Sequence, residues 1–568
     1  TSQLYRIAVS GGREQLYLSM PAASMSFAPD GKTILFEDVR GNEDEARKHH
    51  TSSIARDIWL YTPGSPSARQ LIVREGEDRN PVFGADSDHF YFLSERDGGA
   101  FNVYASSVSA PSQVQQLTRF ARNPVRALTA SRSGMLCFTY DGRIYTMPAA
   151  GGEPQVLNVS IARPDGAPDS VFMRLKSASD GVISPNGKEV AFVSRGDVYV
   201  SSIEFGNTRQ ITNTPEQERS VDWAPDGRSL VYAGERHGSW NLYMASITRS
   251  DEPSFAGATS ITEKPLLVTA QETFQPRFSP DGKEVAFIED RTKIRVINLA
   301  TKQVRSVTDG SQNYSYQDGD ISYEWSPDSK WIVLSFDAKR RWPNSDIGLV
   351  RASGTEPIFN LTQSGYTDTN PRFMMNGDVI IWHSDRNGYR SHASWGAQED
   401  VYAFFINREA YAKYRLTPFE LDELKAAKEQ GSDSVKDAKK GKGKKEAAST
   451  PSKTKDLNID LTNVEDRIVR LTIHSSSLAD AIVTPDGESL YYLCSFEGKF
   501  NLWKTDLRKR STKRVLDVKM DGGSLSLDSK GENMLIATGD RMVKVNLKSE
   551  KQTDVAISAP FTHRGAQE

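Results

Sequence analysis

The residue types that most often carry chemistry show no catalytic pattern in this chain. The two cysteines, Cys137 and Cys494, lie on separate strand-like segments and are too few for a disulfide framework. The sequence contains no Gly-x-Ser-x-Gly nucleophile motif, no His-Glu-x-x-His zinc motif, no phosphate-binding glycine loop and no Cys-x-x-Cys pair. The eight histidines have no triad or metal-centre spacing, and they are His49, His50, His89, His237, His383, His392, His474 and His563. The sequence therefore assigns no catalytic, cofactor-binding or metal-binding residue.

One pair of histidines stands out because its members are adjacent. His49 and His50 lie in a polar insertion over residues 38–53. Neighbouring side chains on an extended segment point to opposite sides, and no cysteine or carboxylate–histidine spacing completes a metal set. A structural or surface role is favoured over metal binding.

A second segment has the composition of a recognition loop. Residues 382–396 combine aromatic, arginine and histidine side chains, which are common at binding surfaces. The candidate contacts for a peptide or a partner protein are Arg386, Tyr389, Arg390, His392 and Trp395. The alternative is a long hairpin that its own aromatic residues pin in place.

A repeated turn sets the architecture that must position these residues. An aromatic or apolar residue is followed by Ser/Ala-Pro-Asp-Gly, as in Phe278-Ser279-Pro280-Asp281-Gly282. Proline fixes the backbone at the start of the turn, and Asp-Gly supplies an acceptor and a positive φ. The turn residues of the copies are Asp30, Asp86, Asn186, Asp226, Asp281, Asp328, Asn376, Asp486 and Asp528, with a degenerate copy at Ser133-Gly134. Four strand-like runs per copy, at intervals of roughly 40 to 55 residues, predict the blades of β-propellers.

The distribution of the copies predicts an all-β chain with two tandem β-propellers. Three copies precede residue 159 and seven follow it. We expect residues 1–158 to be the C-terminal part of a first propeller of the six-bladed type, residues 159–557 a seven-bladed propeller, and residues 558–568 an exit linker. Three blades do not close a ring, so the expectation is a fragment that begins inside its first propeller; an open partial propeller is the alternative.

The second propeller is expected to carry a helical and disordered insertion over about 405–460. Thr417-Pro418-Phe419-Glu420 has the residues of a capping box, and Leu421 and Leu424 would follow on one helix face. Residues 431–456 contain almost no large apolar side chain and predict a solvated loop. Its basic run at 439–445 is read as a tether in preference to a nucleic-acid or lipid contact.

Composition excludes several classes of function. The net charge is −3 with 26% charged residues, so no overall positive field attracts nucleic acid. No apolar run is long enough to span a membrane.

Longer strings beside the turns resemble the tricorn protease family, with the bacterial tricorn-like serine peptidases the most similar. The matching strings lie at residues 47–53, 56–61, 76–81, 92–98, 390–396, 400–403 and 464–471. In that family, a six-bladed and a seven-bladed propeller precede a helical domain, a PDZ domain and a serine peptidase core. No position of this chain matches the catalytic residues of that core.

The resemblance implies a non-catalytic propeller region of a serine peptidase. It would guide or filter oligopeptides or unfolded polypeptide to a protease core absent from this chain. The implied partners are those peptides and the C-terminal PDZ and protease domains of the parent protein, with a homo-oligomer also open, in the periplasm or the cytoplasm, the periplasm being favoured. Two alternatives remain: a stand-alone translocation-type propeller that docks partner proteins, and the propeller of a prolyl-oligopeptidase relative.

Overall fold

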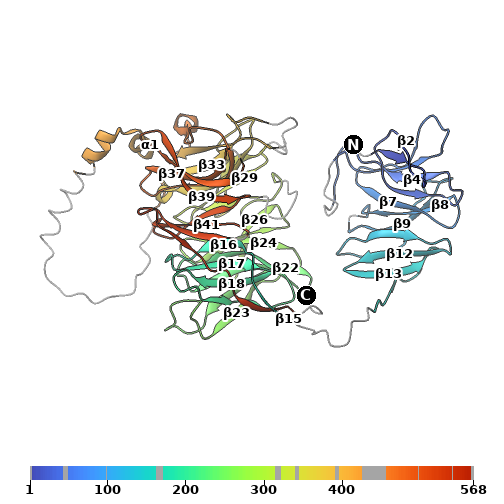
Figure 1. Cartoon of the computed structure of the whole chain (residues 1–568), viewed down its shortest axis with the longest axis horizontal. Coiled ribbons are helices and arrows are strands. Elements are labelled where there is room, and N and C mark those ends of the chain that lie inside the picture. The colour runs from blue at the N-terminus through green and yellow to red at the C-terminus, as the bar shows by residue number, and fades with distance from the viewer. Residues whose placement is uncertain are drawn as a thin grey trace. The chain divides into compact units, whose positions relative to one another are not determined.

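The chain forms two compact units, Thr1–Ala167 (unit 1) and Pro168–Glu568 (unit 2), each considered separately (Figure 1). The structure is a computed structural model that describes residues 3–41, 49–97, 99–160, 171–313, 321–338, 344–390, 396–424, 426, 456–496, 498–539 and 541–563. Strands dominate both units, as the repeated turns predicted.

The described part of unit 1 contains three four-stranded antiparallel sheets, one for each predicted turn copy. They are β3 (Ala23–Phe27), β4 (Ile34–Glu37), β5 (Ile58–Tyr61) and β6 (Arg69–Ile72); β7 (Asp78–Phe83), β8 (His89–Ser94), β9 (Asn102–Ser107) and β10 (Gln115–Gln116); and β11 (Arg126–Ala130), β12 (Met135–Tyr140), β13 (Arg143–Pro148) and β14 (Gln155–Val156). A further pair, β1 (Leu4–Arg6) and β2 (Gln15–Leu18), precedes them.

Among its described residues, unit 2 contains seven four-stranded sheets, in each of which the strands follow chain order. The first four are β16 (Ser179–Ile183), β17 (Glu189–Ser194), β18 (Asp197–Ser202) and β19 (Thr208–Gln210); β20 (Glu218–Trp223), β21 (Ser229–Arg236), β22 (Ser239–Ile247) and β23 (Ile261–Leu267); β24 (Thr273–Phe278), β25 (Glu284–Glu289), β26 (Lys293–Asn298) and β27 (Val304–Ser306); and β28 (Tyr323–Trp325), β29 (Trp331–Phe336), β30 (Asp346–Arg351) and β31 (Phe359–Asn360). The last three are β32 (Asp368–Met374), β33 (Val379–Ser384), β34 (Asp400–Phe405) and β35 (Ile468–Arg470); β36 (Ser477–Val483), β37 (Ser489–Ser495), β38 (Phe500–Asp506) and β39 (Ser511–Met520); and β40 (Ser524–Leu527), β41 (Asn533–Ala537), β42 (Met542–Asn546) and β43 (Gln552–Asp554). A short 3-10 turn, Met375–Gly377, follows β32.

The repeated turn joins the first and second strands of a sheet through its own hydrogen bonds. Between β24 and β25, the Asp281 carboxylate accepts from the Ser279 hydroxyl at 2.6 Å and from the Lys283 N–H at 3.1 Å. Gly282 has φ +70°, a backbone conformation that glycine adopts without strain. The turn is thus held largely by its own residues, with one further hydrogen bond from the Asp281 N–H to the Ser329 hydroxyl of the next sheet, at 3.1 Å.

In two sheets of unit 2, the tryptophan before the turn packs its sheet on the preceding one. Trp223 and Trp325 are buried, and their indole N–H groups donate to the carbonyls of Val182 at 3.0 Å and Arg277 at 3.2 Å, both on the preceding sheet. In unit 1 the equivalent Phe27 is 50% exposed. Burial of the aromatic therefore depends on a preceding sheet to cover it.

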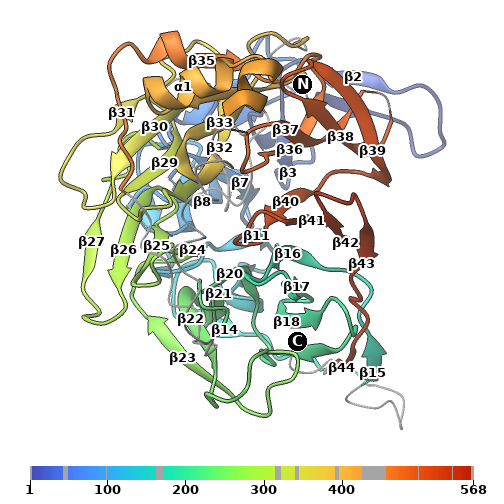
Figure 2. The same cartoon turned by 90° about the vertical axis from the view of Figure 1, so that its left-hand side faces the viewer.

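The first and last sheets of unit 2 also contact each other, β16 packing against β40 and β41 (Figure 2). Beside this contact, β15 (Val171–Arg174) pairs with β44 (Pro560–His563). The expectation of a plain exit linker over 558–568 is therefore wrong for residues 560–563, which form a strand. Phe561 explains the difference, since it is buried in the cluster formed by the first and last sheets.

The predicted insertion of unit 2 contains the expected helix start. Helix α1 (Arg408–Arg415) follows β34, and residues 418–424 form another helical segment. The Thr417 N–H donates to Glu420 at 2.8 Å while the Glu420 N–H donates to the Thr417 hydroxyl at 3.3 Å, which is the predicted capping box. Leu421 is buried, whereas Leu424 is 37% exposed. The basic run at 439–445 lies outside the described residues.

Candidate functional channel

The first strands of all seven sheets of unit 2 surround one cavity of about 530 Å³. Each first strand contributes lining residues, because it is the strand of its sheet that lies nearest the middle of the unit. The lining residues are Gly181, Val182, Asp222, Gln275, Arg277, Phe278, Pro280, Ser322, Tyr323, Glu324, Trp325, Asn370, Pro371, Arg372, Ala479, Asp480, Gly523, Ser524, Leu525 and Ser526. We call this cavity the channel.

Five consecutive sheets each place one charged side chain on the channel. They are Asp222, Arg277, Glu324, Arg372 and Asp480, and their charges alternate in sign. The first four occupy the same position, directly before the buried aromatic of the repeated turn. We call these five residues the charge ring.

The carboxylates of the charge ring tie each sheet to the next. Asp222 accepts from the Phe278 N–H at 2.8 Å, and Glu324 accepts from the Phe373 N–H at 3.1 Å. Asp480 likewise accepts from the Leu525 N–H at 2.7 Å. The acidic members are therefore fixed in place by the backbone of the following sheet.

The two guanidinium groups are held differently. Arg372 lies 3.2 Å from the Asp480 carboxylate and donates to the Leu525 carbonyl at 3.0 Å. Arg277 approaches a carboxylate less closely, at 3.8 Å from Asp222, and its side chain is 41% exposed. Arg277 is thus the accessible cation of the charge ring, while Arg372 is committed to its neighbours.

Burial changes the acidity of the groups around the channel. Desolvation raises the pKa of Glu324 to about 7, although Arg372 and the Phe373 N–H favour its charged form. Behind the channel, burial lowers the pKa of His383 to about 4, and its Nδ1 lies 3.4 Å from the Asn370 amide. The imidazole is consequently neutral near pH 7, while Glu324 changes charge there.

The recognition segment of the sequence analysis is only partly described. Arg386 lies over the rings of Tyr366 and Tyr402, and Arg390 donates to Asp385 at 2.6 Å. Tyr389 is 74% exposed. His392 and Trp395 lie outside the described residues. Of the five predicted contacts, Arg386 and Arg390 thus share the Tyr366 ring and Tyr389 faces solvent.

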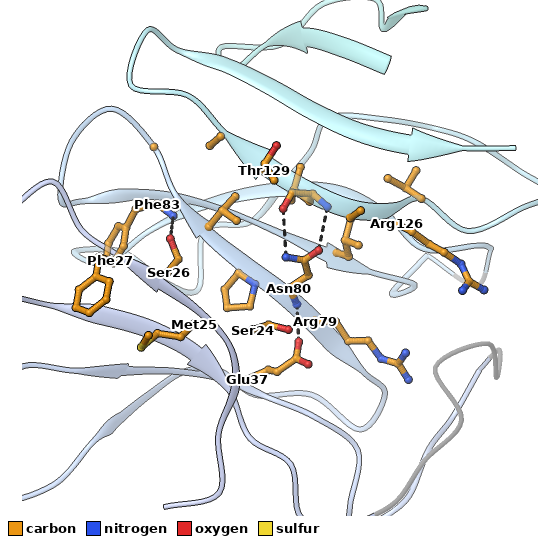
Figure 3. Close-up of a pocket in the computed structure, with 18 of the residues that line it drawn as sticks. Ser24, Met25, Ser26, Phe27, Glu37, Arg79, Asn80, Phe83, Arg126 and Thr129 are labelled. Atoms are coloured by element: carbon orange, nitrogen blue, oxygen red, sulfur yellow. Dashed lines mark hydrogen bonds between the residues drawn. The ribbon is translucent and has the colours of Figure 1, made fainter. Parts of the chain in front are cut away.

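Unit 1 has its own cavity, about 590 Å³, between the first strands of its three sheets (Figure 3). Several of its polar groups are paired within the walls. Asn80 exchanges two hydrogen bonds with the backbone of Leu128, at 3.2 and 2.9 Å, and the Asn80 N–H donates to Glu37 at 2.6 Å. Ser26 accepts from the Phe83 N–H at 3.1 Å. These contacts join neighbouring sheets of unit 1.

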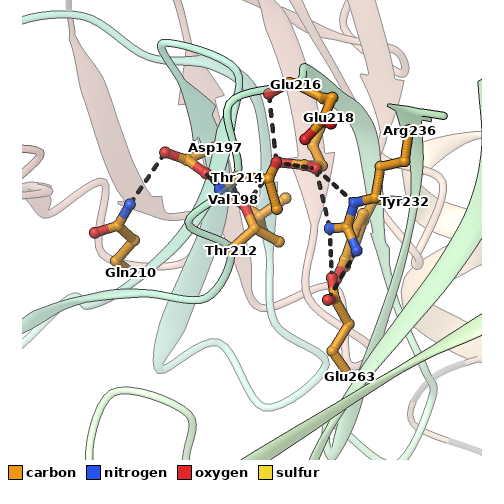
Figure 4. A network of polar contacts seen from close by, with 10 residues as sticks. All are labelled: Asp197, Val198, Gln210, Thr212, Thr214, Glu216, Glu218, Tyr232, Arg236 and Glu263. Atoms are coloured by element: carbon orange, nitrogen blue, oxygen red, sulfur yellow. Dashed lines mark hydrogen bonds and ion pairs between the residues drawn. The ribbon is translucent and has the colours of Figure 1, made fainter. Parts of the chain in front are cut away.

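A conspicuous polar network in unit 2 is architectural (Figure 4). Thr212 donates to Asp197 at 3.0 Å and approaches Glu218 at 2.9 Å, and Arg236 lies 3.0 Å from Glu218. Burial raises the pKa of Asp197 to about 6. The same pattern recurs in a later sheet, where Thr362 and Ser364 bond Asp346 and Asp368: Thr362 donates to Asp346 at 3.2 Å, and Ser364 donates to Asp368 at 2.7 Å. A network that repeats between sheets serves the packing of the sheets.

Within the part of the chain that the structure describes, no group of three or more histidine, cysteine or acidic residues could hold a metal ion. No helix among those residues is long and apolar enough to cross a membrane. Cys137 is half-buried, Cys494 is buried, and both are free thiols.

The sequence analysis missed the charge ring, although the sequence contained a signal for it. Aligning the repeats on the aromatic residue before the turn puts Asp222, Arg277, Glu324 and Arg372 in one column. Asp480 escapes that alignment because it stands three residues before Val483, and not directly before the residue that precedes the turn.

Comparison with known proteins supports a propeller relationship. No family model matches the sequence. A tricorn protease homolog of Saccharolobus solfataricus is 19% identical over 398 residues, covering 68% of this chain and 33% of the relative. The Tol-Pal system protein TolB of Francisella tularensis is 27% identical over 246 residues, covering 35% of this chain and 52% of the relative. The chain spans about half the length, or less, of these relatives.

Among solved structures, the crystal structure of a tricorn protease aligns with a TM-score of 0.51 at 16% identity. The alignment covers 99% of this chain and 51% of that protein. At this level of identity the match is evidence for the fold alone.

Proposed function

Because the chain is tricorn-like and corresponds to the propeller portion of that family, we propose that unit 2 is a closed seven-bladed β-propeller whose channel guides oligopeptides. The protease core and PDZ domain that would receive them lie outside this chain. In this proposal, unit 1 is the corresponding part of the preceding propeller.

The charge ring is the observation that carries the proposal. A peptide presents a carboxylate, an ammonium group and a row of amides, all of which need partners when they leave water. Alternating carboxylate and guanidinium groups on one channel wall can pair with both ends of such a chain. Folded proteins are excluded by size, since the cavity holds only about 530 Å³.

Arg277 is the proposed anchor for peptide carboxylates, because it is the exposed and loosely paired cation of the charge ring. Replacing Arg277→Gln removes a hydrogen bond to a charged group, which is worth about 1.5–3 kcal/mol. We expect the Kd of a fluorescent oligopeptide, measured by anisotropy on the whole chain, to rise by about tenfold or more.

Two comparisons make the binding experiment specific. Arg408→Gln on the exposed surface of α1 is the matched control and should leave the Kd unchanged. An amidated peptide, which lacks the terminal carboxylate, should bind the native chain as weakly as the free-acid peptide binds the Arg277→Gln variant. Equal affinity of the native chain and the Arg277→Gln variant for the free-acid peptide would rule out this anchor.

The TolB likeness favours a second candidate, a propeller that docks a partner protein. In that case the segment with Arg386, Tyr389, Arg390, His392 and Trp395 would be the contact. Arg386→Ala with Tyr389→Ala would then abolish partner binding and leave oligopeptide binding in the channel unchanged. Arg277→Gln would have the opposite effect, weakening oligopeptide binding and leaving partner binding unchanged.

A further inference from the structure

In unit 1, three side chains stand in the order of a serine nucleophile, its base and the acid that orients the base. The Ser52 Oγ lies 2.6 Å from Nε2 of His50, and Nδ1 of His50 lies 2.7 Å from the Glu77 carboxylate. In such a chain of contacts, the serine proton can pass to Nε2 while the carboxylate stabilises the imidazolium that forms.

The backbone brings these residues together from two separate segments. Ser52 and His50 belong to the turn that precedes β5, and Glu77 directly precedes β7. An isolated antiparallel bridge between Thr51 and Gly76 joins the two segments next to the three side chains. The arrangement is therefore fixed by main-chain pairing as well as by side chains.

Burial and charge suit each residue to its role. His50 and Glu77 are buried, while Ser52 is exposed. Burial alone would raise the pKa of Glu77, but the hydrogen bond and charge of Arg79 and the contact with His50 lower it below its usual value. An ionised Glu77 accepts from Nδ1, and Nε2, which lies against the Ser52 hydroxyl, is then the nitrogen that can act as a base toward Ser52.

Ser52 opens onto a pocket that can receive an acyl group. The pocket holds about 390 Å³ and is lined by Arg40, Thr51, Ser52, Ser53, Ala55, Asp57, Arg74 and Glu75. The N–H of Ser53 donates to no residue that the structure describes, and the N–H that follows a nucleophilic serine commonly binds the developing oxyanion. The guanidinium of Arg40 donates to the Ser53 carbonyl at 3.2 Å and adds positive charge beside it.

We propose that Ser52 is an acyl-accepting nucleophile for small esters, with His50 as general base and Glu77 as a positioning residue. Oγ forms a bond to the carbonyl carbon as its proton passes to Nε2 of His50. The bond between that carbon and the leaving oxygen then breaks, and Nε2 returns the proton to the departing alcohol or phenol. Water repeats the sequence to release the acid and restore the Ser52 hydroxyl. This inference rests on unit 1 alone and is independent of the proposed channel function.

The test is acylation of the whole chain by p-nitrophenyl acetate, followed by peptide mapping by mass spectrometry. We expect a burst of p-nitrophenol that matches the amount of protein, with the acetyl group on Ser52. A fluorophosphonate probe should label the same residue. Ser52→Ala should abolish both signals, and Ser67→Ala, at an exposed serine of unit 1 outside the pocket, should retain them.

The base and the acid need their own variants. His50→Gln should slow the burst by about 100-fold or more, the usual contribution of a general base. Glu77→Gln should slow it while both variants keep a cooperative thermal transition. Acetylation confined to lysines, or a burst that His50→Gln leaves unchanged, would overturn the proposal; the three residues would then serve only to pin the turn, and the variants would change the Tm alone.

Discussion

Glu324 lines the channel, and its burial there lowers the stability of unit 2 when its carboxylate is charged. Its carboxylate accepts a hydrogen bond from the next sheet, yet desolvation raises its pKa to about 7. The folded protein therefore binds a proton here more tightly than the unfolded chain, whose glutamates titrate near 4.5. The stabilisation is complete below pH 4.5 and is lost as the pH rises through 7.

Glu324→Gln should consequently stabilise unit 2 at pH 8 and have little effect at pH 5. The gain is at most about 3 kcal/mol, since each pKa unit corresponds to about 1.4 kcal/mol. Urea unfolding at the two pH values measures it. The exposed Glu204→Gln is the control and should show no pH-dependent difference. A destabilised variant at pH 8 would mean that the charge of Glu324 is needed for its electrostatic attraction to Arg372.

The residues of the proposed nucleophilic site could not be recognised from sequence patterns. Ser52 and His50 are two positions apart, a spacing that no common triad motif uses, and Glu77 joins them only through the bridge at Thr51 and Gly76. The sequence pattern predicted that His49 and His50 point to opposite sides of an extended segment; in the structure His49 is exposed and His50 is buried. The sequence does not indicate which acidic residue contacts His50, because that depends on how the turn before β5 packs against the segment before β7.

At the scale of elements, Arg467 holds the chain where it returns from the insertion to the sheet. The guanidinium is buried and donates to the carbonyls of Phe405 at 3.0 Å, Asp460 at 2.7 Å and Thr462 at 2.7 Å. It also lies over the ring of Phe404. One side chain thereby joins β34, the returning segment and the start of β35.

Arg467→Met should destabilise unit 2, because it leaves three carbonyls without their donor while keeping the apolar volume. The expected loss in the free energy of unfolding is at least about 2 kcal/mol, the scale of hydrogen bonds to a charged group. Chemical denaturation measures it, with the exposed Arg514→Met as the control. If both variants unfold at the same urea concentration, the returning segment is held by its apolar contacts alone.

Local elements were predictable because their causes are local. Each turn copy found in the sequence lies between the first two strands of a four-stranded sheet, and even the degenerate copy at Ser133-Gly134 does so between β11 and β12. The capping box of Thr417 and Glu420 needed only four residues to be recognised. The strand β44 was missed because its partner, β15, lies almost four hundred residues earlier in the chain.

For the whole of unit 2, the pairing of β15 with β44 should decide how cooperatively the seven sheets unfold. Deleting residues 558–568 removes β44 and with it Phe561, which packs in the cluster that joins the first and last sheets. We expect a lower Tm and a broader transition by calorimetry. Deleting only residues 564–568 is the control, and an equal Tm for the two deletions would show that the sheets hold together without the strand.

The same pairing has a practical consequence for protein engineering. Val171 and His563 are register partners, so unit 2 begins and finishes at neighbouring points. A domain whose ends are adjacent can be inserted into a surface loop of another protein without straining either connecting segment. Inserted in this way, unit 2 could give an unrelated enzyme a narrow entrance that is lined by charged side chains.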